Sequence, residues 1–181
     1  MNKYVALLLL VWGSLIAGCM HTHEPKLSLA ARTKGATVAL VDTIEDETQV
    51  MCSGVWVSED TIVTAHHCVE GVAIQRAMMK MPPRERLLAA MFGIGMPEFT
   101  EEELQKIDMH YISEDEVTQV GENPITTFDA DVLALDKPHD LAALKVKGHR
   151  PRHLLSPLAQ KIPSTGEEVV IVGHTKGLYW T

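Results

Sequence analysis

The sequence predicts an all-β chain built from antiparallel strands, with one helical insertion. Short runs rich in β-branched residues recur in pairs around turn-forming residues, at 55–64 and again at 130–146. Good helix formers concentrate in one stretch, which follows the prolines at 82 and 83. The composition, 46% hydrophobic and 22% charged over 181 residues, is that of an ordinary globular domain.

The clearest strand pair lies between Cys52 and Cys68. Residues 55–57 and 61–64 predict two strands, and the Ser-Glu-Asp between them predicts a tight turn. A hairpin folds its two ends onto each other. These cysteines, sixteen positions apart, therefore come within reach of a disulfide.

The second strand leads into Thr-Ala-His-His-Cys at residues 64–68. This stretch resembles the Thr-Ala-Ala-His-Cys signature of the trypsin-like serine proteases, whose histidine is the general base and whose cysteine bonds back to the start of the hairpin. The resemblance therefore implies a disulfide between Cys52 and Cys68. Counted from Cys68, it assigns the base to His67. His66 stands where the family usually has alanine. As a neighbouring histidine, it is the alternative base.

A second pair of strands, 130–135 and 141–146, encloses the turn Asp-Lys-Pro-His. Asp140 opens the stretch Asp-Leu-Ala-Ala-Leu-Lys-Val, which resembles the family motif that supplies the triad aspartate. The resemblance implies that Asp140 accepts the proton on the far ring nitrogen of His67, fixes its tautomer and stabilises the imidazolium. Taken alone, an aspartate before an apolar run is usually a turn residue or a cap.

The family fold is a pair of antiparallel β-barrels, so the resemblance implies a trypsin-like double β-barrel. Residues 35–150 correspond to a complete first barrel, opened by a short strand at 37–41. Residues 151–181 correspond to the crossing between the barrels and to the first strand of the second barrel, at 166–174. The Gly-x-x-Val-x-x-Val-Gly pattern in this last stretch resembles the HtrA-type bacterial members.

An insertion of helical character interrupts the predicted first barrel at 72–121. One helix is expected over 84–92, ended by Gly93 and Gly95. A second helix opens at Thr100, whose hydroxyl and Glu103 form the sequence pattern of a capping box. The methionines at 78, 79, 81, 91 and 96 make the insertion a flexible apolar surface. It is either a lid over a substrate groove or a helical cover on an open end of the barrel.

No serine of the chain stands in the family's Gly-Asp/Asn-Ser-Gly-Gly loop, which carries the nucleophile and the oxyanion hole. The serines are at 14, 28, 53, 58, 113, 156 and 164. We therefore expect a serine endopeptidase whose nucleophile lies beyond residue 181. The alternative is a protease-like lipoprotein that has lost catalysis and acts as a binding module. A zinc hydrolase using His66, His67 and Asp140 is a third possibility.

The N-terminus predicts export and lipidation. Lys3 precedes an apolar run at 4–16, which fits a secretion signal. The run ends in Leu-Ile-Ala-Gly-Cys, which resembles the bacterial lipobox. Residues 1–18 are then the signal peptide, Cys19 the lipidated residue and 19–34 a tether. An uncleaved anchor with an incidental cysteine is the alternative. An oxidising compartment allows the other two cysteines to pair, and otherwise they remain free thiols.

The charge of the chain limits the kinds of partner that it can bind. A formal net charge of −8, dispersed along the chain, offers no basic face for nucleic acid. The expected partners are a protein or peptide substrate and a bacterial-type membrane, reached through the lipid anchor on its periplasmic or cell-surface side. We expect no cofactor and no metal, because His21 and His23 lack further ligands nearby.

Overall fold

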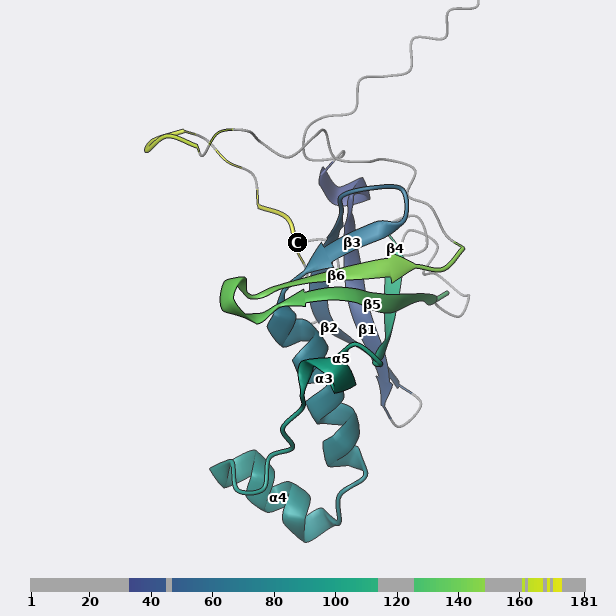
Figure 1. The fold of residues 1–181 in the computed structure, drawn as a ribbon, viewed down its shortest axis with the longest axis vertical. Helices are drawn as coiled ribbons and strands as arrows, with labels where there is room; N and C mark the ends of the chain where they lie inside the picture. The colour runs from purple at the N-terminus through teal and green to yellow at the C-terminus, as the bar shows by residue number, and fades with distance from the viewer. Residues whose placement is uncertain are drawn as a thin grey trace, which may run out of the picture.

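Six antiparallel strands form a closed barrel in the order β1-β2-β3-β6-β5-β4 (Figure 1). The computed structural model describes residues 33–44, 47–113, 126–148, 161, 163–167, 169 and 171–173. The predicted signal peptide, Cys19 and the tether up to residue 32 lie outside these ranges. The predicted class, all-β with helical segments, is confirmed, and one barrel is evident in the described residues.

The strands are β1 (Thr37–Ile44), β2 (Glu47–Trp56), β3 (Thr61–Thr64), β4 (Asp108–Ser113), β5 (Phe128–Asp136) and β6 (Leu141–Val146). The helices are α3 (His66–Met79), α4 (Pro83–Phe92), α5 (Glu101–Leu104) and the 3₁₀ turn η1 (Lys137–His139). The chain thus builds two groups of three strands, β1–β3 and β4–β6. They join along the β3–β6 and β1–β4 pairings.

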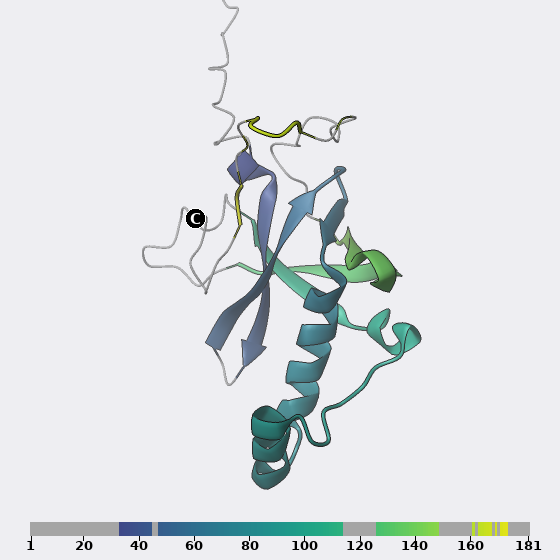
Figure 2. The same ribbon diagram turned by 90° about the vertical axis from the view of Figure 1, so that its left-hand side faces the viewer.

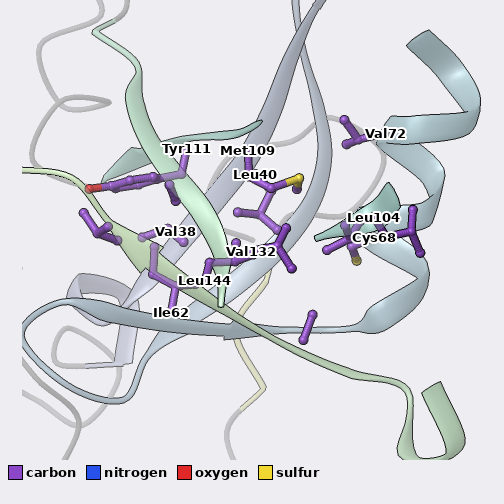
Figure 3. Packing of buried hydrophobic residues seen from close by; sticks show 14 of the residues in the cluster. Val38, Leu40, Ile62, Cys68, Val72, Leu104, Met109, Tyr111, Val132 and Leu144 are labelled. Carbon is purple, nitrogen blue, oxygen red and sulfur yellow. The ribbon is translucent and has the colours of Figure 1, made fainter. Parts of the chain in front are cut away.

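The core fills the barrel interior and extends under the helices. Side chains from β1, β3, β4, β5 and β6 meet those of α3 and α5 (Figure 3). The rings of Trp56 and Tyr111 pack edge to face with centroids 5.6 Å apart, a favoured geometry for aromatic pairs. Val69, Val72 and Leu104 bring the helical segments onto this cluster. One end of the barrel is therefore covered by α3 and α5.

The predicted insertion at 72–121 is helical only in part. The helix expected over 84–92 is α4, and Gly93 ends it in the left-handed conformation at φ 67°. The capping box is present, since Thr100 N–H donates to the Glu103 carboxylate at 2.8 Å and the Thr100 hydroxyl accepts from Glu103 N–H at 3.3 Å. Sequence reasoning missed β4, which lies inside the range assigned to the insertion and pairs with β1 and β5.

Sequence reasoning also missed α3, which begins at His66 directly after β3. Its buried residues are His66, Cys68, Val69, Val72 and Ala73, at the spacing of one helical side. No helix in the described ranges has both the length and the apolar character needed to cross a membrane.

The range 166–174, predicted to open a second barrel, is only partly described. Its described residues, 166, 167, 169 and 171–173, are in no strand. The assignment of residues 151–181 to the crossing and the second barrel therefore stays a prediction.

Candidate active site

His67 and Asp140 lie next to each other because of the register between β3 and β6. The two strands are antiparallel, and Thr64 at the end of β3 pairs with Ala142 near the start of β6. The residues just after β3 and just before β6 therefore meet at the same end of the barrel. This pairing brings together two side chains that are 73 positions apart in the sequence.

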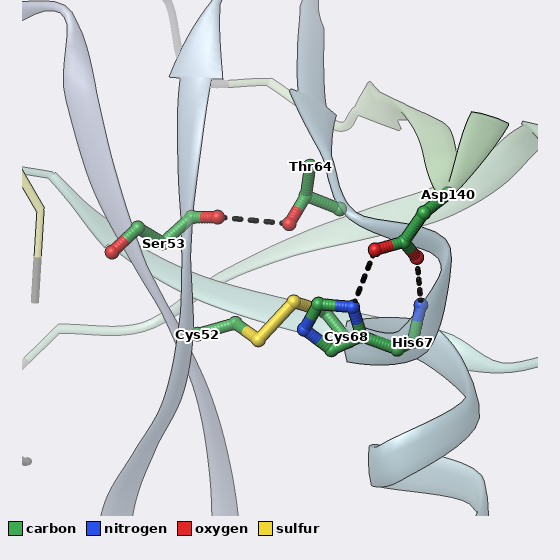
Figure 4. The surroundings of a disulfide bond; sticks show 6 residues. All are labelled: Cys52, Ser53, Thr64, His67, Cys68 and Asp140. Atoms are coloured by element: carbon green, nitrogen blue, oxygen red, sulfur yellow. Dashed lines mark hydrogen bonds and ion pairs between the residues drawn. A yellow bond between two sulfur atoms is a disulfide. The ribbon is translucent and has the colours of Figure 1, made fainter. Parts of the chain in front are cut away.

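The position of His67 is fixed from both sides. Thr64 donates its hydroxyl hydrogen to the carbonyl of Ser53 at 2.8 Å and so ties the end of β3 to β2 (Figure 4). Cys68 forms a disulfide with Cys52, with their Cα atoms 5.9 Å apart, which confirms the predicted bond. The first turn of α3 is thus held against β2 at the residues that flank the histidine.

Asp140 is placed by an unusual backbone conformation. It follows η1 with φ 53° and ψ 46°, and it is the one non-glycine residue with positive φ in the described part of the chain. Aspartate tolerates this left-handed region better than most residues. The conformation turns the chain sharply from η1 into β6 and directs the carboxylate toward α3 (Figure 4).

The Asp140 carboxylate accepts two hydrogen bonds from one residue. Oδ1 accepts from the backbone N–H of His67 at 2.9 Å, and Oδ2 lies 2.7 Å from the ring Nδ1 of His67. An ionised carboxylate can only accept, so the proton of the neutral ring belongs on Nδ1. The other ring nitrogen, Nε2, is then the proton acceptor.

The first of these bonds also caps a helix. The N–H groups in the first turn of a helix have no partner within the helix, and α3 receives no side-chain bond from its own N-cap residue, Ala65. Asp140 satisfies one of these groups from a distant part of the chain. Its negative charge also lies at the favourable end of the helix dipole.

The hydrogen bonds keep Asp140 ionised. The pKa of the Asp140 carboxyl is lowered, first by the backbone N–H of His67, then by its ring, with a smaller contribution from the charge of His66. The side chains of His67 and Asp140 are 67% and 53% exposed. In the described part of the chain, the pair thus lies open at the surface of the barrel.

His66 occupies a different environment. It is buried, with 3% of its surface exposed, and its Nε2 has no hydrogen-bond partner within the described ranges. Both oxygens of Asp140 contact His67. The geometry therefore favours His67 over His66 as the base.

Two further histidine–aspartate pairs occur among the described residues, and no sequence motif singles them out. His110 on β4 lies 2.9 Å from Asp129 on β5, and His139 lies 2.9 Å from Asp136 across η1. A histidine beside a carboxylate is thus not diagnostic by itself. The Asp136 carboxylate also accepts the backbone N–H of its histidine, at 3.3 Å. The His67 pair differs because its two residues are 73 positions apart and meet across the β3–β6 pairing.

One group of potential metal ligands exists in the described part, formed by Cys52, His67 and Cys68. The two sulfurs are bonded to each other, so they offer no thiolate to a metal. The alternative zinc site of His66, His67 and Asp140 has a further difficulty, because Nδ1 of His67 is already engaged by the carboxylate.

The serines of the barrel strands and the hairpin turn, Ser53, Ser58 and Ser113, do not form a nucleophile with this pair. The hydroxyl of Ser53 points away from the His67 ring (Figure 4). Ser58 donates to Asp60 at 3.0 Å in the hairpin turn, and Ser113 is buried at the end of β4. The arrangement of His67 and Asp140 can accept a proton from a hydroxyl brought to it, and it can return that proton.

Comparison with known proteins identifies the family. Residues 52–181, which are more than half of the chain, match the family described as trypsin-like peptidase domain. No curated protein matches the chain.

Solved structures with similarity to this chain share little sequence with it. One is the protease domain of MamO from Magnetospirillum magneticum in its apo form, with 19% identity, a TM-score of 0.39 and coverage of 69% of this chain and 46% of that one. Another is Deg5, with 17% identity, a TM-score of 0.43 and coverage of 83% and 56%. A third is the drosophila Grass clip serine protease of the Toll pathway, with 18% identity, a TM-score of 0.33 and coverage of 71% and 33%. The chain thus spans between 33% and 56% of the length of these structures.

Proposed function

Because the chain belongs to the trypsin-like peptidase family, we propose that it supplies the histidine and the aspartate of a serine endopeptidase. His67 is the general base, Asp140 orients it, and the nucleophilic serine is contributed by a segment beyond residue 181. The observation that carries the proposal is the double hydrogen bond from His67 to a carboxylate 73 positions away, at 2.9 and 2.7 Å.

The proposed reaction uses Nε2 of His67 first as a base and then as an acid. Nε2 takes the hydroxyl proton of the serine while the serine oxygen attacks the scissile carbonyl, and it then donates that proton to the departing amine. A water molecule next releases the acyl group by the same two transfers in the same order. Asp140 stays ionised throughout, because its lowered pKa keeps it negative at neutral pH, and it stabilises the imidazolium.

The experiment uses the longest natural form of the protein that contains this sequence. We expect labelling by a fluorophosphonate probe and cleavage of peptide substrates. His67→Ala removes the base and should lower kcat by a factor on the order of 10⁴ or more. The matched control is His110→Ala, which breaks another exposed pair with an aspartate, His110–Asp129, and should leave kcat within about twofold.

Asp140→Asn separates catalysis from helix capping. The amide oxygen can still accept the N–H of His67, so α3 keeps its cap. The amide nitrogen, however, is a donor and would force the ring proton onto Nε2. We expect a loss on the order of 10⁴-fold in kcat with little change in unfolding midpoint, whereas Asp140→Ala should lower both. Full activity in Asp140→Asn would contradict the assigned role.

A second candidate function is peptide binding without catalysis, because no serine of this sequence lies in the nucleophile motif. In that case the protein is a binding module that retains the fold of the family without its chemistry. The probe then leaves the natural protein unlabelled, and His67→Ala leaves peptide binding unchanged.

We also propose that Cys19 carries a lipid and that the protein is held at a bacterial-type membrane after export. The lipobox-like residues before Cys19 support this, and so does the Cys52–Cys68 disulfide, which suits an oxidising compartment. Mass spectrometry of the detergent-extracted protein should show a chain beginning at an acylated Cys19. An unmodified residue 19 within an uncleaved chain would contradict the proposal.

A further inference from the structure

Helix α4 and the turn after it expose large apolar side chains. Met91, Phe92 and Ile94 are 63%, 64% and 63% exposed, and Leu87 is 57% exposed. Exposed single apolar residues are common on proteins, but contiguous groups of them mark interaction surfaces. We call this group the apolar tip; its members are Leu87, Leu88, Met91, Phe92, Ile94 and Met96.

Helix α4 turns its large apolar side chains toward solvent along its length. Its one buried residue is the small Ala89, while the four large apolar residues between 87 and 92 face outward. A surface helix normally does the reverse and buries its large apolar side chains. The helix lies at the end of α3 that is far from the barrel (Figures 1 and 2). The apolar tip therefore projects from the molecule.

Two glycines fix the shape of the turn after α4. Gly93 has φ 67° and donates its N–H to the carbonyl of Ala89 at 2.9 Å, and Gly95 has φ 73°. Left-handed φ values of this kind suit glycine and strain other residues. The turn thus holds Ile94 at the outer end of α4 by backbone geometry. A preformed turn loses less conformational entropy on binding.

The charge around the apolar tip differs in sign from that of the chain. Lys80, Arg84 and Arg86 lie in and before α4, and Glu85 is the one acidic residue between positions 78 and 97. The chain as a whole carries a formal net charge of −8. None of the three cations has an ion-pair partner within the described part of the chain. The surface therefore complements a partner that is apolar and negatively charged at once.

We propose that the apolar tip inserts into the interfacial layer of a membrane that contains anionic lipids. Such a layer places acyl chains directly beneath negative headgroups, which matches apolar side chains flanked by Lys and Arg. The long stems of Lys80 and Arg84 let their charges reach the headgroups while the apolar side chains lie deeper. The tip then gives the domain a second contact with the membrane, independent of the peptidase chemistry and of Cys19.

The test uses a fluorescent label placed at the tip. In the protein that begins at residue 19, carries Cys19→Ser and keeps its disulfide, Ile94→Cys provides the one free thiol of residues 19–181 for an environment-sensitive nitrobenzoxadiazole dye. We expect its emission to rise with vesicles of phosphatidylcholine and phosphatidylglycerol, and not with phosphatidylcholine alone. A label at Leu133→Cys, on the barrel, is the control, because Leu133 is also well exposed, at 57%.

Two substitutions separate the apolar and charged contributions. Arg84→Gln should raise the lipid concentration for half-maximal binding roughly fivefold, as expected for one basic group near an anionic surface. Leu87→Ser should weaken binding, and Leu133→Ser, which removes a leucine of the same 57% exposure, should not. Circular dichroism establishes that each variant remains folded.

Three results would overturn the proposal. The label at position 94 could remain unchanged with anionic vesicles, or respond equally to neutral ones. It could also respond to rising protein concentration without lipid, which would assign the tip to contact with a second copy of the chain.

Discussion

Asp140 performs two tasks with its two oxygens. One oxygen accepts the N–H of His67 and caps α3, and the other accepts the ring proton of the same residue. Any movement of the helix end therefore moves the ring and its carboxylate together. The orientation of the proposed base is therefore set by the same carboxylate that caps the helix.

Gly54 is required by close packing inside the barrel. A Cβ at this position would lie 2.5 Å from Cγ2 of Ile62 and 3.1 Å from Cγ2 of Val38. Both neighbours are fully buried and β-branched, so they have little freedom to move aside. We expect Gly54→Ala to lower the free energy of unfolding by about 2 kcal/mol, measured by urea denaturation.

Gly71→Ala is the matched control for this substitution. Gly71 lies within α3, and a Cβ there would meet nothing within 4 Å. Alanine should therefore stabilise the helix by about 0.5–1 kcal/mol. Equal effects at both positions would refute the packing argument.

Helix α3 is tied to the barrel at both ends. Asp140 and the disulfide hold its first turn. In its last turn Arg76 donates to both oxygens of Asp42 on β1 at 2.9–3.2 Å, and to the carbonyl of Asp108 on β4 at 2.9 Å. The helix thus connects the two groups of strands, because β1 belongs to one and β4 to the other.

Arg76→Met should be strongly destabilising. The Asp42 side chain is only 5% exposed, and the substitution would leave its carboxylate buried without a cation. Removing one partner of such a pair costs about 3 kcal/mol or more in the free energy of unfolding. Lys106→Met is the control, because its pair with Glu102 is exposed on both sides and contributes at most about 0.5 kcal/mol. Urea unfolding of both variants would show whether burial sets the difference.

The sequence predicted elements whose signals are local. The hairpin of β2 and β3, the end of α4 at Gly93 and the capping box at Thr100 all follow from short-range chemistry, and all are present. The Asp140 position was found through a motif. Its left-handed conformation and its cap on α3 were not predicted, because both depend on the β3–β6 register.

The elements that were missed depend on tertiary context. Sequence reasoning gave no strand for β4, since Asp-Met-His-Tyr-Ile-Ser is short and follows a helical stretch. Its strand conformation is stabilised by pairing with β1 on one side and β5 on the other. In α3 a histidine pair, a disulfide cysteine and a glycine obscure the helical pattern, and contacts with the barrel core compensate.

Exposed carboxylates link the stability of the protein to pH. The pKa of Asp60 is lowered to about 2, first by its bond with Lys145 and then by Ser58 and Thr61. The pKa of Asp136 is lowered by His139, and that of Asp140 by His67. A carboxyl with a lower pKa in the folded state stabilises the protein above its unfolded pKa. This contribution is lost as pH falls through the folded value.

We therefore expect the urea midpoint to be constant near neutral pH and to fall as pH drops from about 4 toward about 2. Asp60→Asn should flatten this dependence, because a carboxyl whose pKa is lowered to about 2 no longer titrates. An unaltered slope in Asp60→Asn would show that the contact between Asp60 and Lys145 does not cause the pH dependence of the urea midpoint.

The β3–β6 pairing has a consequence for how the protein could be divided. His67 belongs to the half of the chain that builds β1–β3, and Asp140 to the half that builds β4–β6. Cleavage at the exposed Gly93–Gly95 turn would leave each fragment with one member of the pair. Reassociation of the fragments would recreate the proposed base, so its proton uptake would report directly on complementation.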